Sequence, residues 1–434
     1  MSVETKVEDP ADPAGDFSVY RNPLVSVTMA STFFLKLVSF LCIPFMTIYL
    51  SKNVDAPPYV IGVIVGLSQI GSLTAGFFSG VLADRVGKRL VLLVGLFGSA
   101  LVFLLFFLTA TFLKGSSAFP VVFGLLNACS GVMSAFFWPV TQVLMADSLP
   151  KERRPAVFRH RYVLTNFAVG IGPPVGAFLG IASARAAFVI SGCSYLVFAV
   201  AFWRLTRGTG FGVSEVSEVS DSSGEASQRR SFGGALKVLG ADRVFRGLTL
   251  SMILFTLAYC QIETNLSAIV SGGFADGVRF FSILLTVNAV AVIVLQPPAT
   301  MISRRLSPRR TILLGNALFA VVCLLFPVAE FGKTGLVALV VLVSMAEVLV
   351  VPTVSVVADE LAPPSMRGTY FGAATLRNLG LGAGPAAGGL VLASFDRGLL
   401  FVFMGLCGVA AWAVILFTLR ENSGADTGPS PEPV

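Results

Sequence analysis

Long apolar runs are the feature that most restricts what this chain can fold into. A helix that crosses a bilayer needs about 20 mainly apolar residues, and twelve such runs follow one another along the 434 residues. They are too long and continuous for the alternating strands of a barrel. The sequence therefore predicts an all-α polytopic membrane protein with twelve transmembrane helices. The expected spans are residues 25–50, 58–83, 90–113, 119–146, 157–183, 186–205, 245–271, 278–302, 311–331, 334–358, 368–394 and 398–419.

The composition argues against an enzyme. Charged residues make up 13% of the chain, whereas a soluble domain carries roughly 25%. The six cysteines stand singly within spans and the one histidine, His160, lies in a basic loop, so neither metal-ligand spacing nor a Ser-His-Asp set is available. We expect no catalytic residue, no metal and no bound cofactor.

The distribution of basic residues predicts the topology. With the amino terminus inside, the cytoplasmic ends and loops hold 23 Lys and Arg residues and the outer loops hold six. Such a bias is typical of the positive-inside rule. It places both termini in the cytoplasm, and it explains the net charge of +7 by topology and anionic lipid rather than by a nucleic-acid partner.

The chain is internally duplicated. Ala146-Asp147-Ser148-Leu149 matches Ala358-Asp359-Glu360-Leu361 at an offset of 212 residues. Between the repeats lies a Gly-, Ser- and Glu-rich stretch that is typical of a flexible linker. The expected plan is two pseudo-symmetric six-helix bundles. The predicted units are a cytoplasmic tail (1–24), a first bundle (25–206), a cytoplasmic linker (207–243), a second bundle (244–419) and a cytoplasmic tail (420–434).

A short polar loop between the second and third runs carries a family resemblance. It reads Gly80-Val-Leu-Ala-Asp84-Arg85-Val-Gly87-Lys88-Arg89-Leu90 and resembles the cytoplasmic loop signature of the major facilitator superfamily. The resemblance implies a monomeric secondary transporter in a bacterial inner membrane that works by alternating access. It also implies a gating role for Gly80, Asp84, Arg85, Gly87 and Arg89.

Charge and helix ends indicate how this loop would gate. Asp84 is expected to face the amino terminus of span eleven near Arg367 and Gly368, where the helix dipole favours an anion. Arg85 and Arg89 would clamp the same carboxylate.

A Gly-Pro element recurs in spans five and eleven. Its members are Gly172, Pro173 and Gly176 in the first copy, and Gly384, Pro385 and Gly388 in the second. Small residues on one face let a neighbouring backbone approach closely, and the proline kinks the helix. The element resembles the antiporter motif of proton-coupled drug exporters. The alternative is plain packing by small residues.

Ionisable residues inside spans are the main candidates for coupling, because a charge in lipid is costly. Glu347 is the preferred proton carrier and Glu263 the second, with Lys36 or Arg377 as the cation that favours the charged carboxylate. In this superfamily spans one, four, seven and ten largely line the central cavity. The alternative is a structural Glu347–Arg377 pair.

Two amides complete the expected cavity. Gln261 belongs to a segment, with Tyr259 and Glu263, that resembles the seventh span of drug exporters. Asn127 stands where many exporters carry an arginine, so the proton relay proposed for that arginine cannot be carried over.

The expected function is export of a lipophilic or amphipathic small molecule in exchange for protons. No ATP-binding loop is present, so the energy must come from an ion gradient, expected to be protons. Phe33, Phe34, Phe136, Phe137 and Trp138 could form an apolar wall for the solute, although aromatic residues in a spanning helix more often face lipid or pack against other helices. The alternatives are a proton-coupled importer, a uniporter, or a membrane receptor or assembly factor that transports nothing.

Overall fold

The regular structure of this chain is helical wherever its residues are described. The computed structural model describes residues 21–149, 154–180, 185–207, 240, 242–329, 332–362, 370 and 373–423. The helices before the linker are α1 (Pro23–Cys42), α2 (Met46–Asn53), α3 (Pro58–Val86), α4 (Lys88–Phe112), α5 (Ala118–Asp147), α6 (Arg154–Phe178) and α7 (Arg185–Thr206). Those after it are α10 (Arg243–Tyr259), α11 (Asn265–Gly273), α12 (Gly277–Arg305), α13 (Pro308–Ala329), α14 (Gly332–Leu361), α16 (Asn378–Ser394) and α17 (Arg397–Ser423).

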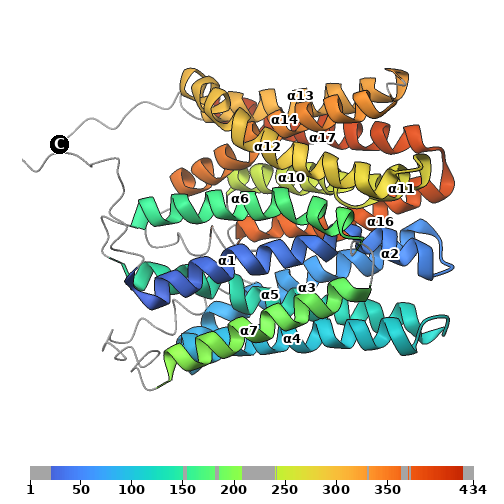
Figure 1. The fold of residues 1–434 in the computed structure, drawn as a ribbon. Helices are drawn as coiled ribbons and strands as arrows, with labels where there is room; N and C mark the ends of the chain where they lie inside the picture. Colours follow the sequence, from blue (N-terminus) through green and yellow to red (C-terminus); the bar gives the residue numbers. More distant parts are fainter. Residues whose placement is uncertain are drawn as a thin grey trace, which may run out of the picture.

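These helices run roughly parallel to one another, as in a polytopic membrane protein (Figure 1). Among the described residues, ten helical segments are long and apolar enough to cross a bilayer. The two remaining predicted spans are α6, which begins with basic residues, and α16, which has only 17 residues because a short 3-10 helix, Thr375–Arg377, precedes it. Both lie alongside the other spans (Figure 1). The predicted all-α membrane fold is confirmed.

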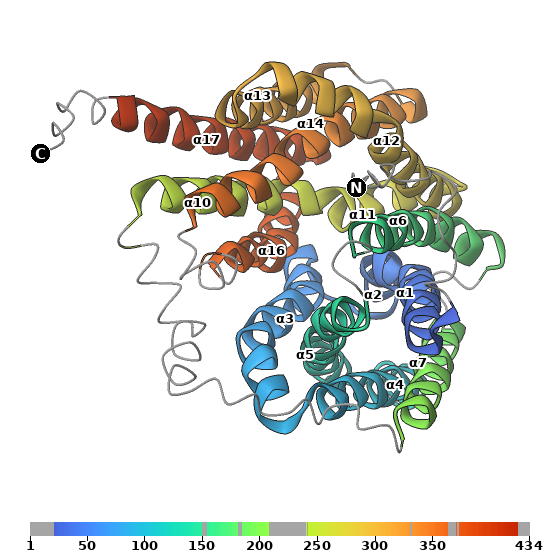
Figure 2. The same ribbon diagram turned by 90° about the vertical axis from the view of Figure 1, so that its left-hand side faces the viewer.

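Two bundles are visible in a view along the helices (Figure 2). One contains α1 to α7 and the other α10 to α17, and α3 and α6 of the first pack against α16 and α12 of the second. Each bundle contains a large apolar cluster, one around Phe106 and Phe188, the other around Phe255 and Phe319. The second cluster also includes Phe45, Ile48 and Ala177 of the first half. The duplication seen in the sequence is therefore also a duplication of packing units.

The first span of each bundle is broken at the same place. A 3-10 turn, Ile43–Phe45, separates α1 from α2, and another, Cys260–Ile262, separates α10 from α11. Pro44 lacks the N–H that would continue the first helix, while Thr264 leaves the helical region in the second with φ −111° and ψ −84°. Broken helices near the middle of a membrane typically surround a binding site.

The bundles are joined at one end. We call the end that holds the start of α1 and the end of α17 the terminus side, and the opposite end the far side. Toward the far side the rings of Phe45 and Phe281 are 5.9 Å apart, and Thr286 Oγ1 donates to the carbonyl of Gly170 at 2.8 Å. Toward the terminus side each bundle has its own small cluster, one around Met145 and the other around Ala358. Among the described residues, these contacts between the halves thus lie toward the far side.

The seam between α3 and α16 depends on glycine. A Cβ at Gly62 would overlap the carbonyl of Pro385, and a Cβ at Gly66 would overlap the carbonyl of Gly382. Only the absence of a side chain lets the two backbones approach so closely. The Gly-Pro element of span eleven therefore lies directly on the interface between the halves.

Candidate functional site

A cavity of about 340 Å³ lies in the middle of the bundle. Most of its lining comes from the first half, on α1, α3, α4, α5 and α7, and the second half adds residues around the break after α10 and from α16. Spans one, four and seven contribute to the lining as expected. No described residue of α14, the tenth span, lines it.

Lys36 faces this cavity from α1. Its ammonium nitrogen lies 5.0 Å from the ring centroid of Phe40 and 5.5 Å from that of Trp138. These cation–π contacts hold the charge in place without neutralising it. Among the described carboxylates, none lies within ion-pair distance of Lys36.

Glu263 faces the same cavity from the other half. It directly follows the helix break, and its backbone N–H donates to the carbonyl of Cys260 at 3.1 Å. Its half-buried carboxylate forms no hydrogen bond or ion pair with the described part of the chain, yet it interacts electrostatically with Lys36. The cavity thus brings one ammonium and one carboxylate together from opposite bundles.

Arg161 is a site residue that the sequence analysis missed. It was counted with the basic residues of the loop before span five, although it lies inside the predicted span 157–183 and inside α6. The side chain is half-buried, donates from Nε to Thr32 Oγ1 at 3.4 Å, and interacts electrostatically with Lys36. Helical spacing could have found it, since Arg161 shares a face with the buried residues Val157 and Ala168.

A group of small polar side chains, the polar shelf, lines the first-half wall of the cavity. Within it, Ser68 donates to the carbonyl of Val65 at 3.4 Å and Ser130 donates to the carbonyl of Asn127 at 2.7 Å. The other members have no hydrogen-bond partner among the described residues. The polar shelf consists of Ser68, Gln69 and Ser72 on α3 and Ser130 and Ser134 on α5.

Four of the five aromatic residues take the packing or outward-facing positions that the alternative interpretation expects, and they form no wall of the cavity. Trp138 is the one member of the predicted set that lines the cavity. Phe137 is fully buried in the first-half core, Phe34 lies on the outside of the bundle with 48% of its surface exposed, and Phe33 stacks on Phe167. Neighbouring positions on a helix point about 100° apart, so consecutive aromatic residues cannot share one wall. Phe136 likewise packs against the first-half core.

Asn127 acts as a brace at the edge of the cavity. Its side-chain Nδ2 donates to the carbonyls of Ile64 and Val65 at 2.7 and 2.9 Å. These bonds tie α5 to α3 directly behind the polar shelf. The residue lines the cavity as expected, with its amide donors committed to the neighbouring backbone.

Gln261 was expected in the cavity, but the structure places it between the break and α16. Its Nε2 donates to the carbonyl of Gly384 at 2.7 Å, and its Oε1 accepts from Asn265 at 2.6 Å. Asn265 in turn donates to the carbonyl of Pro385 at 3.0 Å. A Cβ at Gly388 would overlap Gln261. The amide pair therefore fixes the Gly-Pro element of span eleven against span seven, which explains why Gln261 is fully buried.

Glu347 is at the centre of a separate hydrogen-bond network within the second half. Tyr259 Oη donates to Glu347 Oε2 at 2.5 Å. Asn288 Nδ2 donates both to Tyr259 Oη at 3.1 Å and to Ser344 Oγ at 2.9 Å. Tyr259 ends α10 just before the break that carries Glu263, so the network reaches the cavity through span seven.

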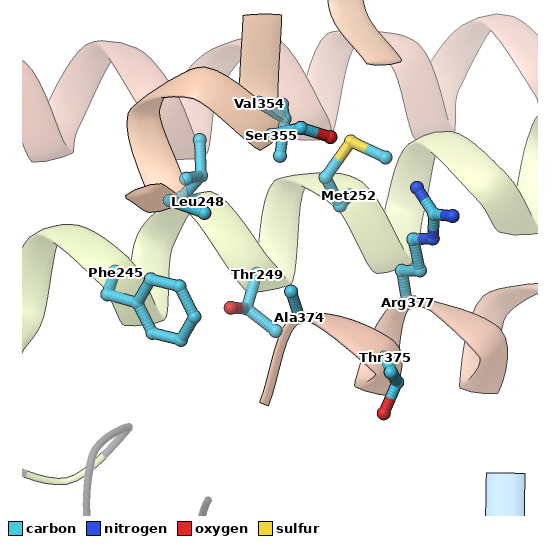
Figure 3. A pocket seen from close by; sticks show the side chains of 10 residues that line it. Phe245, Leu248, Thr249, Met252, Val354, Ser355, Ala374, Thr375 and Arg377 are labelled. Atoms are coloured by element: carbon cyan, nitrogen blue, oxygen red, sulfur yellow. The ribbon is translucent and has the colours of Figure 1, made fainter. Parts of the chain in front are cut away.

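The alternative Glu347–Arg377 pair is wrong for this structure. Arg377 lines a different pocket of about 170 Å³ between α10, α14 and the residues before α16. Its side chain extends toward Met252 (Figure 3), and its carbonyl accepts from Thr256 Oγ1 at 2.9 Å. Neither predicted carboxylate faces this pocket. Of the two proposed cations, only Lys36 shares a pocket with one of the two predicted carboxylates.

The gating loop is described in part. Gly87 separates α3 from α4 with φ 91°, a conformation that favours glycine. Arg89 Nε donates to Thr206 Oγ1 of α7 at 2.9 Å, which ties the loop to its own half. The structure does not describe the side chains of Asp84 and Arg85 or the surroundings of Gly80. Arg367 and Gly368 also lie outside the described residues. The latch to span eleven stays a prediction.

Both Gly-Pro elements contact the first span of their own half. A Cβ at Gly172 would lie 2.9 Å from the carbonyl of Leu37, and one at Gly176 would lie 3.3 Å from the carbonyl of Leu41. In the second half, a Cβ at Gly384 would lie 2.7 Å from the carbonyl of Leu257. Pro173 and Pro385 each stand inside a helix. The glycines provide close packing, and any influence on transport direction stays a prediction.

Comparison with known proteins identifies the family. The model described as Major Facilitator Superfamily matches residues 28–378 and 262–433. An uncharacterized MFS-type transporter, YqjV of Bacillus subtilis (strain 168), is 26% identical over 391 residues, which cover 89% of this chain and 91% of YqjV. A Na(+), Li(+), K(+)/H(+) antiporter of Planococcus maritimus is 27% identical over 427 residues, covering 91% and 96%.

A solved structure gives the same result for the fold. The nucleoside transporter NupG matches with a TM-score of 0.73 at 13% identity, over 92% of this chain and 99% of NupG. Identity this low shows a shared fold and no more. Together with the family match, it establishes that this chain belongs to the major facilitator superfamily and is a membrane transporter rather than an enzyme.

Proposed function

We propose that this transporter exports an amphipathic small molecule in exchange for protons. The observation that carries the proposal is the placement of Glu263, a carboxylate without a hydrogen-bond partner in the described chain, at a helix break inside the cavity. Lys36 faces it from the other half. The family relationship to a cation/proton antiporter supports the exchange.

Exchange follows when proton and solute compete for one group. A cationic group of the solute binds Glu263 only while the carboxylate is ionised, and a proton binds only when the solute has left. Each crossing of the membrane therefore carries one or the other. Such competition couples the two fluxes without a second ion site.

Glu347 has a supporting role in this proposal. An ionised carboxylate accepts a hydrogen bond more strongly than a protonated one, so the charge on Glu347 sets the strength of its bond to Tyr259. Because Tyr259 ends α10 beside the break, a change at Glu347 alters how firmly that break is held. The structure thus favours Glu263 over Glu347 as the group that meets the solute.

The direction and the location form part of the proposal. The positive-inside bias of the sequence assigns the terminus side to the cytoplasm of a bacterial cell. In the described part of the chain, contacts between the halves lie toward the far side, which supports loading from the cytoplasm. Rocking of the halves about the α3–α16 seam would then expose the cavity to the outside.

Proteoliposomes that contain the full chain test the proposal. With an imposed pH gradient, addition of amphipathic solutes should cause proton movement opposite to the solute. Glu263→Gln should abolish this exchange, and Glu347→Gln should slow it. Glu360→Gln, at an exposed position on α14, is the matched control and should behave as wild type. Full pH-dependent exchange in Glu263→Gln would refute the assignment.

A second candidate is exchange of an alkali cation for protons. The hydroxyl oxygens of the polar shelf could ligate such an ion together with Glu263, and the Planococcus relative is described as such an antiporter. The ammonium of Lys36 in the same cavity opposes a second cation. Addition of sodium or potassium salts to the same proteoliposomes, without solute, separates this candidate from the first.

A further inference from the structure

The charged residues of the cavity restrict the substrate further than the proposed function, which specifies only an amphipathic small molecule. Resting on the proposed function, we propose that the solute is a zwitterion, bound with its carboxylate at Lys36 and its ammonium at Glu263. Among the described residues that line the cavity, these two carry the only charges. They approach the solute from opposite halves of the transporter.

The environment of Lys36 suits an anionic group. Its ammonium is flanked by the rings of Phe40 and Trp138, and Arg161 adds a second positive charge nearby through its position beside Thr32. An aromatic ring stabilises a cation but cannot accept its N–H groups as strongly as an ionised oxygen does. The three donors of Lys36 are therefore available to a carboxylate.

The environment of Glu263 suits a group rich in N–H donors. The neighbouring Thr264 donates its hydroxyl proton to the carbonyl of Cys260 at 2.8 Å, so its oxygen remains an acceptor. On the polar shelf, Ser68 and Ser130 also donate to backbone carbonyls of their own helices. The carboxylate and these hydroxyl oxygens together offer acceptors, which is what an ammonium requires.

A ligand with a single charge would match only one of the two charged residues that line the cavity. An amine without an acid would leave Lys36 without a counter-charge from the ligand, and an acid without an amine would leave Glu263 without one. An unpaired charge in a desolvated site is costly. A zwitterion neutralises both at once, and since its two partners belong to different halves, its binding also draws the halves together.

Ligand binding to the purified full-length transporter tests this inference. The probes are γ-aminobutyrate, ε-aminocaproate and ω-aminolaurate, which differ in the separation of their charges. Each is compared with its methyl ester, which retains only the amine charge, and with its N-acetyl derivative, which retains only the acid charge. Dissociation constants come from ligand-dependent shifts in the melting temperature of the transporter.

We expect at least one zwitterion to bind about tenfold more tightly than both of its derivatives, because either derivative leaves one charge unpaired. Lys36→Gln should make the zwitterion and its methyl ester bind equally. Glu263→Gln should do the same for the zwitterion and its N-acetyl derivative. Lys36→Arg and Glu263→Asp should retain the preference. The control is Lys333→Gln, a lysine between two rings at the far side, which should bind as wild type does.

Two results would overturn the inference. One is equal binding of a zwitterion and either derivative to the wild type at every chain length, or no binding of any zwitterion; this comparison needs no variant to fold. The other is a preference that survives both glutamine substitutions. Binding is measured without a proton gradient, so a failure of exchange in proteoliposomes with the preference intact would refute the proposed function alone.

Discussion

Two lysines of this transporter have the same aromatic surroundings and opposite electrostatic ones. Lys36 lies over the rings of Phe40 and Trp138, at 5.0 and 5.5 Å. Lys333 lies over the rings of Phe274 and Phe280, at 5.4 and 5.2 Å. Lys333 forms an ion pair with Asp276 at 2.6 Å on the exposed far side, whereas Lys36 has no such partner among the described residues and faces Glu263 across a cavity.

The difference separates a lysine with a structural role, Lys333, from a lysine that is available to bind the solute, Lys36. Asp276 and Lys333 both belong to the second half and tie the start of α12 to the start of α14, so their bond has no reason to break when the halves move. Lys36 and Glu263 belong to different halves, and a direct bond between them would occupy the groups that a solute needs. Because Lys36 and Glu263 are not paired with each other, both charges remain available to bind a solute, and charged residues inside spans commonly mark substrate sites.

The most direct way to break the comparison is to give Lys36 a local partner of the kind Lys333 has. Ser39 lies one helical turn from Lys36 and lines the same cavity. In Ser39→Asp the new carboxylate would pair with Lys36 within α1, at a spacing that favours ion pairs. We expect exchange in proteoliposomes to fall by about tenfold or more, because the ammonium of Lys36 is then bound to the new carboxylate and is no longer available to the solute.

Ser39→Asn is the matched control for this prediction. It has nearly the same volume and no charge, and it also removes the hydroxyl that contacts Tyr195. Its exchange rate should stay near that of wild type. If Ser39→Asp retains full exchange, the availability of Lys36 is not what distinguishes it from Lys333.

The Glu347 network sharpens the comparison inside the second half. Tyr259→Phe removes the hydroxyl that donates to Glu347 at 2.5 Å and accepts from Asn288 at 3.1 Å. A buried charged acceptor that loses a donor costs about 1.5–3 kcal/mol. We expect slower exchange, by several-fold, with the binding preference for a zwitterion intact. Loss of binding instead of rate would place Glu347, rather than Glu263, against the solute.

The two Gly-Pro elements offer a comparison of stability. Gly384→Ala would place a Cβ against both the thiol of Cys260 and the carbonyl of Leu257, while Gly172→Ala meets Leu37 and Phe40 at 2.9 Å. Overpacking typically costs about 1–3 kcal/mol. Melting temperatures of the purified variants should fall more for Gly384→Ala than for Gly172→Ala, because its neighbours are closer. The reverse order would mean that the second element tolerates movement better than the first.

Much of the fold could be predicted from the sequence. The lengths of the apolar runs indicate the spans, the basic loops indicate the topology, and the internal repeat indicates two bundles. The broken first spans were less visible. Pro44 marks one break, but the break before Glu263 contains no proline or glycine, so its cause is tertiary. Arg161 was missed because it was counted with the cytoplasmic basic residues, although it lies inside both the predicted span 157–183 and α6.

The sequence analysis predicted the charged residues of the cavity but did not predict the small polar residues that line it. Lys36 and Glu263 stand out because ionised groups in spans are rare. The serines of the polar shelf do not, since a serine in a transmembrane helix commonly bonds its own backbone. The duplication also misleads here: the position 212 residues before Glu347 is Ala135, and that before Arg377 is Thr165. The Gly-Pro elements and the broken first spans recur in both halves, whereas the charged residues inside the spans do not follow the internal repeat.

The smallest expected effect is at the exposed ion pair, and it completes the comparison. The hydrogen bond from Lys333 holds the pKa of Asp276 below its usual range, so the pair contributes stability at neutral pH and loses it only as the pH falls through that lowered pKa. The pair is solvated and screened, so Asp276→Asn should leave both the melting temperature and the exchange rate unchanged within error at neutral pH. Strong acid should likewise remove any residual difference between variant and wild type. If Asp276→Asn instead reduced exchange as much as Ser39→Asp, then a paired lysine on the far side would matter as much as the unpaired one in the cavity, and the separation of a structural lysine from one available to the solute would fail.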